Sequence, residues 1–149
     1  MVLTTAVLLG ANSCGLKSNI TRTKRLFGGE FLVQAQVAPN ANMNTPVAVE
    51  FLIVYDDKLM ETLAKTNAKD WFTNRKQFRQ DNLKDYESWY WEWVPGQQTK
   101  DERIPMKPGA KGAFVFANYA VAGDNRAKLE PNRSVTITLN ERAFTATQD

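Results

Sequence analysis

The sequence contains no histidine and only one cysteine, Cys14. Without histidine the chain cannot build a Ser-His-Asp triad or a Cys-His pair, and one thiolate alone does not make a zinc site. A single cysteine cannot close an internal disulfide either, so packing alone has to hold the fold together. No apolar run approaches the roughly 20 residues that a helix needs to cross a bilayer. These absences exclude the commonest catalytic centres and favour a binding protein.

Carboxylates are the catalytic groups that remain. The acidic pairs at 56–57 and 101–102, together with Glu92, could supply the two carboxylates of a glycosidase. Each has a simpler role as a helix cap, a loop charge or a strand residue, and no spacing singles out two of them. Gly109 and Gly112 belong to a turn between strands and do not form a phosphate-binding loop. We predict a protein that is not an enzyme and uses no metal or cofactor, with a small carboxylate hydrolase as an alternative.

The distribution of charge argues against nucleic acid as a partner. Residues 15–30 carry the whole net charge of +3, whereas residues 31–149 balance 15 basic against 15 acidic side chains. A nucleic-acid-binding protein concentrates Lys and Arg on its folded body. The basic segment is therefore interpreted as a tether near a negatively charged membrane surface, or else as a solvated linker.

The N-terminal segment has the pattern of a bacterial lipoprotein leader. An apolar run at residues 2–11 is followed by small residues and by Cys14, as a lipoprotein signal requires. The pattern is imperfect, because no Lys or Arg follows Met1 and Asn12 is unusual two places before the cysteine. We predict a signal peptide over residues 1–13 and a lipid-modified Cys14 that begins a basic tether over residues 14–30. The alternative is an ordinary buried thiol.

Alternating apolar residues dominate the rest of the chain and predict a single β domain over residues 31–149. Short strands are separated by Gly, Pro and Asn turns, and no βαβ unit repeats. This pattern favours a mainly β, antiparallel sandwich. The expected strands are residues 31–37, 47–55, 88–94, 102–106, 113–119, 126–129 and 134–140.

Two helices are expected to form one insertion between the second and third strands. The first begins with Asp56 or Asp57 as its cap, and the second covers about residues 68–79. Before them, three asparagines between Pro39 and Pro46 predict an exposed hairpin loop.

The strongest strand contains three tryptophans. Strict alternation places Trp89, Trp91 and Trp93 on one face of residues 88–94. We expect this face to point into the core, because large aromatic side chains are usually buried. A platform that stacks a sugar ring or binds a peptide is the functional alternative.

The order of these segments resembles the TssJ family, the outer-membrane lipoproteins of the bacterial type VI secretion system. The resemblance covers about residues 31–140 and is one of pattern, without a short signature. It rests on the Cys14 leader, the Asn/Pro loop that leads into residues 46–55, the helices with Leu59–Leu63 and Trp71-Phe72, and the segments 93–97, 114–119 and 135–139.

The resemblance implies a transthyretin-like β-sandwich with a helical insertion, anchored by lipid on the periplasmic face of the outer membrane. Its partner would be the periplasmic domain of a large, TssM-like inner-membrane protein, within an envelope-spanning complex. The loop after the first strand is the family's partner contact, which here implies Asn40, Asn42, Met43 and Asn44. A lipoprotein of another secretion machine is an alternative, since the tryptophan stripe is not a feature of the family.

Overall fold

The structure, a computed structural model, describes residues 28–131 and 133–149. Cys14, the predicted signal peptide and nearly all of the predicted tether lie outside the described residues. In the described part no helix is long and apolar enough to cross a membrane.

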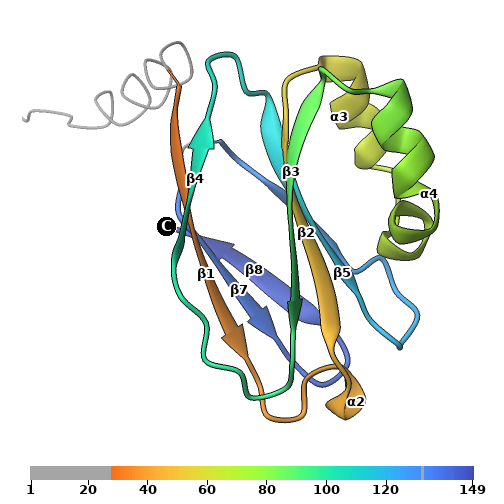
Figure 1. The fold of residues 1–149 in the computed structure, drawn as a ribbon, viewed down its shortest axis with the longest axis vertical. Helices are drawn as coiled ribbons and strands as arrows, with labels where there is room; N and C mark the ends of the chain where they lie inside the picture. Colours follow the sequence, from red (N-terminus) through yellow and green to blue (C-terminus); the bar gives the residue numbers. More distant parts are fainter. Residues whose placement is uncertain (1–27, 132) are drawn as a thin grey trace, which may run out of the picture.

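Two four-stranded sheets pack face to face, which confirms the predicted mainly β sandwich (Figure 1). The strand order is β4-β1-β7-β8 in one sheet and β3-β2-β5-β6 in the other. The strands are β1 (Gly29–Val37), β2 (Val47–Val54), β3 (Tyr86–Trp93), β4 (Glu102–Met106), β5 (Gly112–Asn118), β6 (Arg126–Leu129), β7 (Val135–Leu139) and β8 (Phe144–Gln148).

The strand prediction differs from the structure in two respects. A strand that was not predicted, β8, follows β7 and pairs with it antiparallel. The alternation of apolar and polar residues in β8 is weak, because only Phe144 and Ala146 pack against the core and neither is fully buried. In addition, β1 and β7 are parallel, with Val33 opposite Val135, so the sandwich is not wholly antiparallel. The chain passes through the other sheet between these two strands, so no hairpin forces them to run in opposite directions.

The predicted helical insertion is confirmed and covers the outer face of the second sheet (Figure 1). Helix α3 (Asp57–Leu63) begins at Asp56, whose Oδ1 accepts a hydrogen bond from the Leu59 N–H at 2.7 Å. Helix α4 (Ala68–Asp81) is capped in the same way by Asn67. These caps satisfy N–H groups that a helix start leaves without partners.

Two apolar clusters result from this arrangement. The larger lies between the sheets and includes Phe31, Phe51 and Ile137. The smaller lies between the helices and the second sheet, where Trp71 stacks on Phe116 with ring centroids 5.1 Å apart. Because both faces of β2 and β5 are covered, these strands are apolar almost throughout.

The tryptophans of β3 point toward the core between the sheets, as predicted. Trp93 is buried, and its ring stacks on Trp91 with centroids 5.3 Å apart. Trp89 and Trp91 also pack against this core but remain partly exposed. They are only half-covered because β3 lies at the edge of its sheet.

Candidate functional site

The predicted partner loop lies at one end of the sandwich, where three connections meet. It leads from β1 to β2 and contains the short turn α2 (Ala41–Asn44), which is visible at the lower end of Figure 1. The backbone N–H groups of Asn42 and Met43 donate to the carbonyls of Asn140 and Glu141, in the connection between β7 and β8. The Asn42 side chain contacts the third connection, which follows β5, through a hydrogen bond from the Ala120 N–H. The loop is therefore tied to two other segments.

The backbone of α2 is left-handed at three consecutive residues. Asn42, Met43 and Asn44 have φ values of 47°, 56° and 62°. Asparagine tolerates this conformation because its short side chain can form local hydrogen bonds, whereas a residue such as methionine is disfavoured by roughly 1–2 kcal/mol. The surrounding contacts must hold Met43 in this conformation, which is a pattern common at functional sites.

Asn42 is the residue that holds the turn. Its Nδ2 donates to the Pro46 carbonyl at 2.9 Å, and its Oδ1 accepts from the Ala120 N–H at 2.7 Å. Its own carbonyl accepts from the Thr45 hydroxyl at 2.6 Å. The side chain is buried, at 3% exposure, and its amide is bonded within the chain, which differs from the expectation that Asn42 offers its amide to another protein. A polar loop residue need not be exposed when neighbouring backbone groups can satisfy it.

The other three predicted contact residues lie on the surface. Asn40 and Asn44 are exposed, and Met43 is 45% exposed although it is a large apolar side chain. Thr45 and Pro46 are exposed beside them. The result is a fixed turn that presents one flexible thioether between polar neighbours, which suits a small protein contact.

Tyr119 supports the loop from below. Its side chain is buried, and its hydroxyl donates to the Asn140 carbonyl at 3.1 Å. Burial, which disfavours the charged phenolate, raises the pKa of Tyr119 to about 12. The hydroxyl is therefore neutral at physiological pH and serves as a donor that positions the β7–β8 connection.

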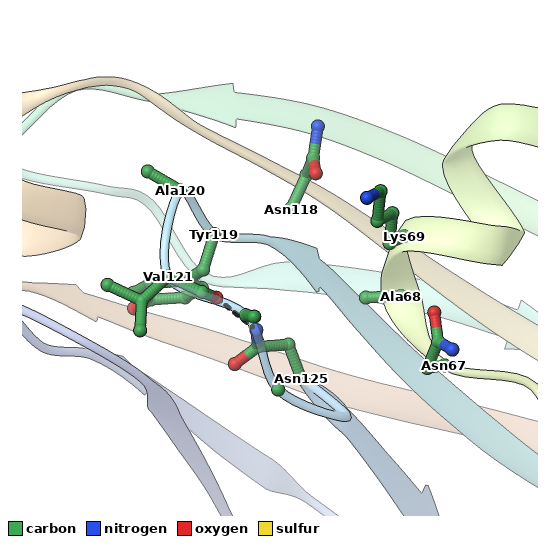
Figure 2. A pocket seen from close by; sticks show the side chains of 10 residues that line it. Asn67, Ala68, Lys69, Asn118, Tyr119, Ala120, Val121 and Asn125 are labelled. Atoms are coloured by element: carbon green, nitrogen blue, oxygen red, sulfur yellow. Dashed lines mark hydrogen bonds between the residues drawn. The ribbon is translucent and has the colours of Figure 1, made fainter.

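A cavity of 370 Å³ opens beside this end of the sandwich, between the start of α4 and the loop after β5 (Figure 2). Asn67, Lys69 and Asn118 line one side, and Asn125 fastens the opposite loop by donating to the Val121 carbonyl at 3.2 Å. Some polar groups that line the cavity already form hydrogen bonds within the chain, because Asn67 caps α4 and Asn125 bonds to its own loop. In residues 28–131 and 133–149, no cluster of His, Cys, Asp or Glu could hold a metal ion.

One buried ionic cluster was not expected from the sequence. Glu50, at 1% exposure, accepts from Trp71 Nε1 at 3.0 Å and from Arg75 at 3.2 Å, beneath α4. The sequence does contain an indication of this cluster, because Glu50 is the only charged residue in the otherwise apolar strand β2. A carboxylate buried in this way needs charged or hydrogen-bonding partners.

Comparison with solved structures places this fold among known proteins. The T6SS lipoprotein TssJ1 from Pseudomonas aeruginosa matches with a TM-score of 0.60 and 16% identity, over 82% of this chain and 97% of the other. The fold is TssJ-like. Serratia marcescens Lip, a membrane-bound component of the type VI secretion system, matches with a TM-score of 0.61 and 14% identity, over 79% of this chain and 96% of Lip.

A third structural match comes from the same secretion system. A chain in a structure of the T6SS protein TssM C-terminal domain from EAEC matches with a TM-score of 0.55 and 16% identity, over 80% of this chain and 97% of that one. No protein-family model and no curated protein sequence matches the chain. The TssJ-like fold is therefore evident from structure at identities too low for sequence comparison.

Proposed function

We propose that this chain is a lipid-anchored, non-enzymatic component of the membrane complex of a type VI secretion system. The similarity to TssJ1 and to Lip, each over nearly the whole length of the related protein, supports the proposal. In it, acyl chains on Cys14 hold the domain at the periplasmic face of the outer membrane. The basic residues that follow act as the tether.

The partner is an inner-membrane protein of the TssM type, and its periplasmic domain binds the α2 turn. The observation that carries this assignment is the fixed left-handed turn, which exposes Met43 between Asn40 and Asn44. Burial of one apolar side chain among polar contacts is a frequent way to anchor a small interface. Asn42 acts from inside the turn and does not touch the partner.

Purification of the full chain from detergent-solubilised envelopes tests this function. A large inner-membrane protein with a periplasmic domain should copurify and be identified by mass spectrometry. The control is the Met43→Gly variant, which keeps the buried Asn42 and should reach the same membrane fraction without the partner. Recovery of the partner at unchanged levels with this variant would place the contact elsewhere, with the exposed face of α4 as the next candidate.

A further inference from the structure

Strand β3 has one open edge. It pairs only with β2, and within residues 28–131 and 133–149 no strand lies on its other side. The strand is eight residues long and contains no Pro, Gly or Lys. The other edge strands are shorter, at four or five residues, and β4 also contains Pro105. Natural sheets usually protect their edges with such features, so β3 is the edge best suited to accept a further strand.

The backbone groups that point away from β2 can be assigned from the ladder. Tyr55 N–H donates to the Asp85 carbonyl at 2.8 Å, at the start of the β2–β3 pairing. Residues that exchange hydrogen bonds with the neighbouring strand alternate along an antiparallel pair. Counted in steps of two from Asp85, Trp89 and Trp91 are therefore residues that bond to β2. The N–H and C=O groups of Ser88, Tyr90 and Glu92 therefore point outward.

The far end of this outward row is closed within the chain. Val94 follows in the same alternation, and its N–H donates to Gln97 Oε1 at 3.0 Å, while its carbonyl accepts from the Gln97 N–H at 3.0 Å. These two bonds show that the outward groups at this edge are available for hydrogen bonding. They also close the outward row beyond Glu92.

Hollows flank the edge at both ends. One, of 400 Å³, lies between the end of α4 and the start of β3, where Leu83 is 72% exposed and the buried Tyr86 hydroxyl has no hydrogen-bond partner in the described part of the chain. The other, of 390 Å³, is lined by Trp91, Trp93 and the loop that follows β3. The partly exposed indoles of Trp89 and Trp91 form the inner side of the edge. This side suits apolar side chains of an incoming strand.

The outer side of the edge is positively charged beside Ser88 and Tyr90, whereas the exposed Glu92 lies on the same side nearer the end of the strand. Arg75 lies over the Tyr90 ring, 4.8 Å from its centroid, and Arg79 Nη2 is 3.2 Å from Ser88 Oγ. Arg79 is 61% exposed, and both guanidinium groups share the single buried carboxylate of Glu50. A second copy of this chain, paired antiparallel about Tyr90, would bring its Arg75 against the first Arg75, although its Glu92 would lie opposite Ser88. Like charges at such a contact are unfavourable, whereas carboxylates would be attracted.

We propose that the open edge of β3 binds an extended segment of another protein by strand addition. The incoming strand alternates apolar and acidic side chains, with the apolar ones against Trp89 and Trp91 and the acidic ones toward Arg75 and Arg79. Backbone hydrogen bonds to residues 88, 90 and 92 supply the affinity, and the alternate side chains supply the selectivity. This surface is separate from the α2 turn and does not depend on the secretion role.

Amide hydrogen exchange of the full chain, followed by NMR, tests the geometry and the binding together. The probe is a blocked nine-residue peptide of alternating Val and Glu. Without peptide, the amides of Ser88, Tyr90 and Glu92 should exchange faster than those of Trp89 and Trp91. Saturating peptide should slow the outward amides at least about tenfold. Slow exchange of the outward amides in the free monomer, or no slowing with millimolar peptide, would overturn the proposal.

Two substitutions at Glu92 provide a matched pair. Compared with Glu92→Ala, Glu92→Pro removes only an outward N–H, which an edge strand tolerates, and should weaken peptide binding at least about tenfold. Glu92→Ala keeps that N–H and should change the affinity by less than about threefold. Equal affinities of the two variants would contradict strand addition. Near-ultraviolet circular dichroism verifies that Glu92→Pro is folded.

The charge of the probe provides an independent test that needs no backbone variant. A peptide with Lys in place of Glu should bind at least about tenfold more weakly to the native chain. Arg79→Ala should reduce this preference by at least about threefold. A Lys peptide that binds as well as the Glu peptide would overturn the predicted chemistry of the partner. Protection of the edge that rises with protein concentration, without peptide, would show that a second copy occupies it and would also overturn the proposal.

Discussion

Trp71 Nε1 donates a hydrogen bond to Glu50 Oε2 at 3.0 Å, and both side chains are 1% exposed. The bond ties helix α4 to the central strand β2 through a charge that would otherwise be costly to bury. The same carboxylate receives Arg75 and, at 3.7 Å, Arg79. Glu50 therefore positions the arginines that lie beside β3.

Trp71→Phe should lower the free energy of unfolding by about 2–4 kcal/mol. The change removes a charge-assisted donor from a buried carboxylate and leaves space beside Phe116. Arg79→Ala is the control and should cost at most about 1 kcal/mol, because Arg79 is largely exposed. Urea denaturation measures both values. Equal losses in the two variants would contradict the central role of the indole.

Asn42→Ala should destabilise the domain by about 2–3 kcal/mol. The substitution removes the hydrogen bonds to Pro46 and Ala120, and it places alanine at a φ of 47°, which alanine disfavours. Asn40→Ala, an exposed change whose side chain makes no capping bond, should stay within about 0.5 kcal/mol of the native chain. Thermal melting followed by circular dichroism compares the two. A native melting temperature for Asn42→Ala would show that the turn is held by its backbone alone.

The elements with strong periodicity could be predicted from the sequence, and the elements with weak periodicity could not. The apolar runs of β2 and β5 indicate strands that are buried on both faces, as the structure shows. Asp56 likewise indicates the start of a helix, which it caps. In β8, small and hydroxylated residues alternate with little contrast in hydropathy, so tertiary contacts decide that segment. The parallel pairing of β1 with β7 is set by the path of the whole chain and leaves no mark on either strand.

The candidate site was predictable in position but not in detail. Its Asn and Pro content indicates a turn, and Met43 is exposed in the structure as that interpretation requires. The separate roles of the asparagines depend on Ala120 and Asn140, which are far away in the sequence. Sequence alone therefore could not separate Asn42, which holds the turn, from Asn40 and Asn44, which lie on its surface.

Stability should fall as the pH rises from about 10 to 12. Burial raises the pKa of Tyr119, and of Tyr55 with help from its hydrogen bond to Glu87, to about 12 in the folded chain. Unfolded tyrosine ionises near pH 10. The contribution of these hydroxyls is therefore complete below pH 10 and is lost as the pH approaches 12. Tyr119→Phe should be less stable at neutral pH but lose less over this range; an identical alkaline decline would contradict the assignment.

Cys14→Ala should release the chain from membranes without unfolding the sandwich. A single acyl chain gives only marginal anchoring, whereas the several chains of a bacterial lipoprotein hold a protein firmly. Fractionation of envelopes measures the release, and circular dichroism verifies the fold. The intact mass of the native, membrane-extracted chain should show an acylated Cys14 as the first residue, and an unmodified cysteine there would refute the anchor.

Met43→Gly should abolish partner capture while leaving the domain at least as stable. Glycine readily adopts the φ of 56° found at this position, so the substitution removes about 1 kcal/mol of backbone strain together with the exposed side chain. Loss of binding then cannot be attributed to unfolding. If Met43 anchors the contact, its removal should weaken binding at least about tenfold, as the loss of a central interface residue typically does.

Met43→Leu is the matched control, because it keeps a large apolar side chain on the same turn and should retain most of the binding. Capture from envelope extracts, with thermal melts of each variant, gives both measurements. Full capture by Met43→Gly would show that the turn is not the contact surface. Loss of capture by both variants would show that the partner recognises the thioether itself or the shape of the turn, rather than apolar area at this position.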